Sequence, residues 1–297
     1  MMASATVDTP LAAAPRREKT LLTVLSRNRI ATAAALVLAG ICLAAIFAPL
    51  LAPGEHIRMS PADRLQSPAE YGWLGTDVFG RDVLSRILYG LRISLGVGVV
   101  SVVVASFCGT VIGMLAGYLG GWPEYVSMRV VDVLFSFPSI ILAILIVSIV
   151  GAGFTSIILA IALVQTPIFA RIVRGSTLSV RSAEYVEAAR ASGAKTGPIL
   201  ARHILPNIAG PILVQLALSM SGAVVIEAAL SFLGLGAVPP TPSLGSMLSE
   251  NRTAMELAPW TVLYPGIALA VLVFSINLVG DAARDELDPR LRTTTNM

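Results

Sequence analysis

Residues 93–119 read ISLGVGVVSVVVASFCGTVIGMLAGYL, a long run without a single charged side chain. A helix needs about 20 mostly apolar residues to cross the hydrocarbon core of a bilayer. The run meets that length and is continuous, whereas the strands of a membrane β-barrel alternate apolar and polar residues over about ten positions. It therefore predicts a membrane-spanning helix.

Five further runs have the same apolar character. They cover residues 31–49, 130–150, 154–170, 208–233 and 259–280. The chain is 55% hydrophobic and only 13% charged, whereas soluble domains are about 25% charged. This composition excludes a soluble or largely disordered chain, and the presence of only two cysteines excludes a disulfide-built domain. We therefore predict an all-α membrane protein with six transmembrane helices.

Basic residues between the spans predict the orientation, because cytoplasmic loops carry an excess of Lys and Arg. With the N-terminus inside, most of the 21 Lys and Arg residues lie on the cytoplasmic side. Both termini are thus predicted to be cytoplasmic. We expect a partly disordered segment at 1–30 whose basic residues lie near anionic lipid, a membrane domain at 31–280 and a cytoplasmic tail at 281–297.

The predicted outer loop at 53–92 carries turn glycines and charges of both signs. It contains Gly75-Thr76-Asp77, Gly80-Arg81-Asp82 and Ser85-Arg86. Local ion pairs that fold this loop over the outer surface are one interpretation, and a solvated connecting loop is the other. A second outer segment, at 234–258, contains Pro239-Pro240, whose rigidity favours a shaped surface over a flexible tether.

The cytoplasmic loop at 171–207 predicts two short helices. Ser182 is placed to cap the first helix, and Gly193 to end it in a left-handed conformation. Thr196 is placed to cap the second helix, and Pro206 to break the chain before the next span. Small alanines on the first helix would allow close approach by another protein, while an amphipathic helix lying on lipid is the alternative.

Two charged residues fall inside the apolar runs, where a charge facing lipid is costly. Asp132 is expected to pair with Arg129, three residues earlier, or to reach the interface. Glu227 must face protein or a watery cavity, so interhelical hydrogen bonding and a role in a substrate path remain open. Proton coupling is a weaker third interpretation, because other titratable groups for a relay are lacking. Gln215 and Asn277 are the other polar candidates for a translocation path.

Several kinds of site have no signature in the sequence. The chain lacks a GxxxxGK[ST] loop for nucleotide phosphates, and it lacks HExxH, CxxC and GxSxG motifs. We therefore predict no catalytic residues and no bound cofactor. Two histidines leave almost nothing for a metal site, and basic residues do not interleave with aromatics, so nucleic-acid binding is not expected.

The cytoplasmic loop contains a distinctive spacing. Glu187-Ala188-Ala189 is followed by Gly193 and then by Ile204-Leu205-Pro206. This spacing resembles the EAA motif of ABC importer permeases, in which the loop docks into a groove of a separate ATPase subunit. The residues that the resemblance places in ATPase coupling are Tyr185, Glu187, Ala188, Ala189, Gly193, Ala194, Leu205 and Pro206.

Other motifs are similar to those of the dipeptide, oligopeptide and nickel type, and specifically to its second, C-type permease. They comprise the outer-loop motifs above, GLRISL at 90–95, Phe137-Pro138, LSFLGLG at 230–236, Ser243-Leu244-Gly245 and NLVGD at 277–281. The resemblance implies the type I ABC importer permease fold. It also implies docking of an extracytoplasmic binding protein, for which the outer candidates are Asp77, Arg81, Asp82, Arg86 and Ser243.

The resemblance further implies a non-catalytic subunit that works by alternating access. Its expected partners are a second homologous permease, one or two ATPase subunits that bind ATP and Mg²⁺, and the binding protein. The expected substrate is a di- or oligopeptide, with nickel, haem, glutathione or another small solute as alternatives. A stand-alone secondary transporter would instead predict inverted repeats and ionisable groups at the midplane, which the sequence does not clearly show.

Overall fold

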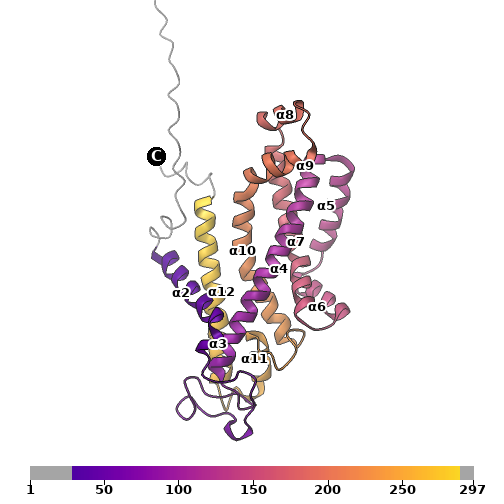
Figure 1. Ribbon diagram of the computed structural model, residues 1–297. Coiled ribbons are helices and arrows are strands. Elements are labelled where there is room, and N and C mark those ends of the chain that lie inside the picture. The colour runs from indigo at the N-terminus through magenta and orange to yellow at the C-terminus, as the bar shows by residue number, and fades with distance from the viewer. Residues whose placement is uncertain (1–28, 288–297) are drawn as a thin grey trace, which may run out of the picture.

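The computed structural model describes residues 29–287 and is almost entirely helical (Figure 1). Five of its helical segments are long and apolar enough to cross a membrane, and the bent pair of α5 and α6 would make a sixth. The long helices of this part of the chain are α2 (Arg29–Ile46), α4 (Val83–Leu119), α7 (Phe154–Val180), α10 (Leu205–Phe232) and α12 (Trp260–Leu287). The predicted all-α membrane fold is confirmed.

The prediction of one continuous helix at 130–150 is wrong, because the helix is broken within this range. Two helices replace it, α5 (Gly121–Phe135) and α6 (Ser139–Val150), and they meet at an angle of 95°. Pro138 causes the break because it has no N–H to donate and disfavours helical backbone at the preceding residue. Its own ψ of 131° is extended, outside the helical region.

The outer loop is shorter than predicted, because residues 83–92 form the first turns of α4 rather than a loop. Asp82 caps this helix, and its carboxylate accepts a hydrogen bond of 2.6 Å from the Ser85 backbone N–H. The cap satisfies one of the unpaired donors at the helix start. α4 therefore begins with a polar segment, residues 83–92, which precedes its long apolar run.

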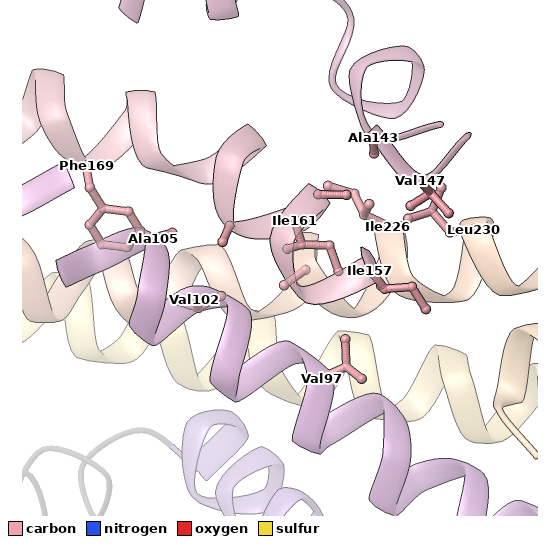
Figure 2. Packing of buried hydrophobic residues seen from close by; sticks show 13 residues of the cluster. Val97, Val102, Ala105, Ala143, Val147, Ile157, Ile161, Phe169, Ile226 and Leu230 are labelled. Carbon is pink, nitrogen blue, oxygen red and sulfur yellow. The ribbon is translucent and has the colours of Figure 1, made fainter. Parts of the chain in front are cut away.

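α4 and α7 lie side by side along their lengths (Figure 1). Gly109, Gly113 and Gly117 form a stripe on α4, and a Cβ at each would lie within 3 Å of α7 atoms. Small residues in such a stripe let helix backbones approach closely in membranes. Next to the stripe, Phe169 packs near Ala105 in the buried core of α4, α6, α7 and α10 (Figure 2).

Short elements cover both ends of the bundle (Figure 1). One end, which we call the α11 end, carries α3 (Ala48–Leu51), η1 (Pro61–Asp63), α11 (Leu244–Glu250) and η3 (Arg252–Ala254). The opposite end, called the α8 end, carries α8 (Glu184–Ala191), α9 (Thr196–Ile199) and the π-helical turn η2 (Leu200–Ile204).

The two predicted short helices exist, but their predicted caps are wrong. Ala183 and Lys195 occupy the N-cap positions, without a side-chain hydrogen bond. Pro206 does not break the chain, since α9, η2 and α10 run on as one helical segment. The proline is the second residue of α10 and comes directly after the π turn, where the backbone hydrogen-bond pattern already departs from that of an α-helix.

Candidate functional site

The C-terminus of α8 is closed by a glycine in the left-handed conformation, as predicted. Gly193 has a φ of +78°. The Gly193 N–H donates to the Arg190 carbonyl, and the Ala194 N–H donates to the Ala189 carbonyl at 3.1 Å. These two bonds form a Schellman motif, which satisfies carbonyls that would otherwise lack partners at the helix end. The turn between α8 and α9 is therefore defined by its backbone.

α8 is anchored to the bundle through its inward face. Val186 is fully buried in an apolar cluster with residues of α7, α9, η2 and α10, including Val173, Ile199 and Ile204. The Arg190 guanidinium lies over the Tyr118 ring of α4, 5.3 Å from its centroid. α8 is therefore packed directly against the adjoining ends of α4, α7 and α10.

The outward face of α8 is exposed. Tyr185, Glu187 and Ala188 carry exposed side chains, and Ala189 is half-buried. Of the other predicted coupling residues, Gly193 and Pro206 are exposed, while Ala194 and Leu205 are half-buried. The structure thus brings the glutamate and the first alanine of the EAA triplet to one free surface at the α8 end.

A buried ion network occupies the α11 end. The Arg81 guanidinium donates to the Asp77 carboxylate at 2.6 Å and also pairs with Glu250 of α11. Arg86, in the first turns of α4, lies 3.2 Å from the same Glu250 carboxylate. The side chains of Asp77, Arg81 and Arg86 are at most 2% exposed. The network therefore ties the outer loop, α4 and α11 together.

Further bonds attach the outer loop to the helices around it. The Asn251 side chain accepts from the Val78 N–H at 3.2 Å and donates to the Met247 carbonyl at 2.8 Å. The Trp260 indole at the start of α12 donates to the Thr76 carbonyl at 3.2 Å. Of the two interpretations of this loop, the structure supports local ion pairs that fold it over the end of the bundle.

The five outer docking candidates are all buried. Asp77, Arg81 and Arg86 form the ion network, Asp82 caps α4, and Ser243 caps α11 through a capping box with Ser246. Their burial favours a role in shaping the surface over direct contact with a partner. Sequence reasoning missed Glu250, although it is one of few acidic residues in its segment.

His56 lies beside this network. Its ring stacks on Tyr89 of α4, with centroids 3.6 Å apart, and its carbonyl accepts a hydrogen bond from Arg86. Burial, and secondly the positive charge of Arg86, lower the pKa of His56 below its ordinary value. The imidazole is therefore kept neutral over a wider pH range than a free histidine.

Replacing Glu250 with glutamine is expected to loosen the α11 end, because Arg81 and Arg86 would lose a shared counter-charge. Loss of hydrogen bonds to charged groups predicts a decrease of about 1–3 kcal/mol in the free energy of unfolding. Thermal unfolding of the purified complex measures this. Glu256→Gln, at an exposed acid outside the network, is the matched control. Equal stability of the two variants would contradict the conclusion that the network holds the outer loop, α4 and α11 together.

Glu227 of α10 is buried, with 1% of its surface exposed. The Ser94 hydroxyl of α4 donates to its carboxylate at 2.6 Å, and the Ser231 hydroxyl donates at 2.7 Å. Of the roles left open by the sequence, these contacts support interhelical hydrogen bonding. The carboxylate joins α4 to α10 at Ser94, where the polar first turns of α4 give way to its apolar run.

The other path candidates lie apart from Glu227. Gln215 is half-buried and donates to the Ser219 hydroxyl at 2.9 Å, while Asn277 on α12 is exposed. Sequence reasoning missed Gln165 of α7, a buried amide that donates to the Ser219 carbonyl at 3.2 Å. The sequence feature that could have identified Gln165 is that it is a lone amide side chain within an apolar run. The Gln165 contact joins α7 to α10.

Asp132 pairs with Arg171 of α7 at 2.7 Å, so the expected pairing with Arg129 is wrong. The partner lies on a neighbouring helix, which the spacing along α5 cannot reveal. The nearby Glu124 accepts a 2.6 Å hydrogen bond from Arg174. Within residues 29–287, the structure contains no group of three or more His, Cys, Asp and Glu that could hold a metal ion.

Comparisons with known proteins agree with this architecture. A family model described as "binding-protein-dependent transport system inner membrane component" matches residues 109–293. A second model, the N-terminal transmembrane domain of oligopeptide transport permease C, matches residues 20–68. The first model alone covers more than half of the chain.

Two curated relatives cover nearly the whole chain. A dipeptide transport system permease protein of Alkalihalophilus pseudofirmus is 45% identical over 269 residues, which are 91% of this chain and 88% of the relative. A glutathione transport system permease protein of Pectobacterium atrosepticum is 44% identical over 268 residues, 90% of this chain and 89% of the relative.

The fold is also similar to that of a solved transporter. A chain of the inward-facing MetNI methionine ABC transporter aligns with a TM-score of 0.51 at 22% sequence identity, covering 68% of this chain and 96% of that chain. At this identity the likeness concerns the fold, which is that of an ABC importer permease. The protein therefore belongs to the family of inner membrane components of binding-protein-dependent transport systems, the permeases of ABC importers.

Proposed function

We propose that this chain is the C-type permease subunit of an ATP-driven importer for di- or oligopeptides. The observation that carries the proposal is the exposed face of α8, a helix of fixed geometry whose opposite face is buried among four helical elements. Its glutamate and alanine match the triplet through which such permeases contact ATPase subunits. The 45% identity to a dipeptide permease supports the substrate class.

In this proposal the α8 end faces the cytoplasm, and both termini lie there. Two ATPase domains bind below, hold ATP and Mg²⁺, and supply all of the hydrolysis. A second, homologous permease completes the membrane pathway, and a binding protein delivers the peptide to the α11 end. The rigid surface held by the Asp77, Arg81, Arg86 and Glu250 network supplies part of that docking face.

The mechanism follows from the contacts at the α8 end. Closure of the ATPase dimer moves α8, and the buried Val186 and the Arg190–Tyr118 contact carry the movement into α7, α10 and α4. Bound nucleotide shifts the population between inward- and outward-open states through its different affinity for the two. The peptide is released when the α8 side opens.

Uptake by the reconstituted complex tests the proposal. Proteoliposomes that hold this chain, its permease partner and its ATPases are expected to accumulate a labelled dipeptide when supplied with the binding protein and ATP. Glutathione is the second candidate, because of the 44% identical glutathione permease, and competition between the two solutes ranks them. ATP-independent uptake by this chain alone would contradict the proposal and favour a secondary transporter.

A further inference from the structure

A groove of about 620 Å³ runs between α2 and α12, two helices that lie side by side (Figure 1). It lies toward the α8 end, where α2 begins and α12 ends. One lining residue, Arg29, is charged. The others are almost all apolar and comprise Ile30, Ala33, Ala34, Val37, Ala270, Val271, Phe274, Ser275 and Leu278. The groove is therefore an apolar hollow with a single cation.

The groove opens outward from the bundle. Val37 on α2 is 43% exposed and Phe274 on α12 is 66% exposed. The small side chains of Ala33 and Ala270 leave the hollow between the larger ones. Because both helices are long and apolar enough to cross a membrane, an apolar component of the membrane is expected to fill it.

The length of the groove is close to the depth of one leaflet. Its lining runs from Arg29 to Val37 on α2 and from Leu278 to Ala270 on α12. At 1.5 Å per residue, each of these stretches is about 12 Å long. Half of a hydrocarbon core that is about 30 Å thick measures about 15 Å. A lipid acyl chain of one leaflet can therefore lie along most of the groove.

Arg29 supplies the charge at the α8 end of the groove. It is the first residue of α2 and is exposed, and it forms no ion pair with another residue of the range 29–287. The nearest acids along α12, Asp281 and Asp285, do not line the groove. A guanidinium matches the geometry of a phosphate, which it can bind through two parallel hydrogen bonds. A cation at one end of an apolar groove is complementary to a phosphate that carries an acyl chain.

We propose that the α2–α12 groove binds an anionic phospholipid, whose phosphate pairs with Arg29 and one of whose acyl chains lies along Ala33 and Ala270. The choice of the inner leaflet rests on the proposed function, in which the α8 end faces the cytoplasm. Anionic lipids of that leaflet attract basic residues near the membrane surface. A helix of the second permease is the competing occupant. It would need an acidic residue at the level of Arg29, whereas every anionic phospholipid brings a phosphate there.

Photochemical labelling tests the site. The complex of this chain with its permease and ATPase partners is reconstituted in phosphatidylcholine vesicles that contain a phosphatidylglycerol with a photoactivatable group in one acyl chain. Labelled peptides are then identified by mass spectrometry. We expect labelling of α12 between Ala270 and Leu278. Unlabelled phosphatidylglycerol is expected to compete with this labelling, and an equal amount of added phosphatidylcholine is not.

Two pairs of variants separate the phosphate contact from the acyl-chain contact. Arg29→Gln is expected to reduce the labelling about tenfold, the effect of losing charge-assisted hydrogen bonds. Arg202→Gln, at an exposed arginine of η2 outside the groove, is its control and is expected to change nothing. Ala33→Phe fills the groove without a change of charge and is expected to reduce the labelling to a similar extent. Ala39→Phe, at an exposed alanine of α2 outside the groove, is expected to leave it unaltered.

Three outcomes would overturn the proposal. Equal labelling of the parent and Arg29→Gln complexes, or equal competition by the two lipids, would show ordinary boundary lipid without a specific site. The third is no labelling of this stretch in the parent complex. If Ala33→Phe then also releases the second permease, the groove belongs to a helix of that subunit. Dipeptide uptake distinguishes these failures from a failure of the proposed function, since an absent lipid site leaves uptake in place, whereas a wrong transport assignment removes uptake and leaves the labelling.

Discussion

Replacing Gly109 with valine is expected to prevent stable assembly of the membrane domain. A Cβ at Gly109 would lie 2.4 Å from the Phe169 Cβ and 2.7 Å from the Thr166 carbonyl oxygen of α7. The backbone cannot give way without separating α4 from α7, which share the most extensive contact of any two helices within residues 29–287. We expect a loss of more than about 3 kcal/mol, above the usual cost of overpacking, measured by thermal unfolding and by the yield of intact complex.

Gly96 provides the matched control on the same helix. A Cβ there meets no atom within 4 Å, and the residue is exposed. Gly96→Val makes the same chemical change and is expected to leave the yield and the unfolding temperature almost unaltered. Similar losses in both variants would show that helix propensity, and not the approach of α7, limits the substitution.

Replacing Ala188 with arginine is expected to reduce at least tenfold the ATP hydrolysis that the substrate-loaded binding protein stimulates. Ala188 lies on the exposed face of α8, next to Glu187 and away from the buried Val186. An arginine would hold a partner surface several ångströms away while leaving the fold of this chain unaltered. We expect at least a tenfold loss of stimulated activity, comparable to losing about 1.4 kcal/mol of coupling, measured in proteoliposomes.

Ala188→Ser is the control at the same position, since the side chain stays small. It is expected to retain most of the stimulated activity. Co-purification of the ATPase subunits distinguishes a failure to bind from a failure to transmit movement. Full stimulation in Ala188→Arg would show that this face of α8 does not contact the ATPase subunits.

The membrane spans could be predicted from the sequence because burial in lipid imposes one requirement, an apolar run of sufficient length. The sequence contains Pro138, but it does not reveal that the helix is broken there. A proline in a membrane helix can be accommodated or can end the helix, and neighbouring helices decide which. The same proline chemistry gave the opposite outcome at Pro206, where the π turn of η2 keeps the helical segment continuous.

Side-chain partners were predicted less well than helices. The Gly193 turn was correct because a left-handed residue at a helix end is a local property. The pairs Asp132–Arg171 and Arg86–Glu250 join residues that are distant in the chain, so no local pattern predicts them. Glu250 and Gln165 were missed for this reason, and the roles of Asp77 and Arg81 became clear only with their burial.

α4 reaches from the buried ion network at Arg86 to the Tyr118 ring beneath Arg190, as one helix of 37 residues without an internal proline. At 1.5 Å per residue such a helix is about 55 Å long, well beyond the thickness of the hydrocarbon core. A tilt of about 10° around its midpoint would displace each end by roughly 5 Å, in opposite directions. Because α4 is one continuous helix, a small tilt would therefore move its two ends in opposite directions on opposite sides of the membrane.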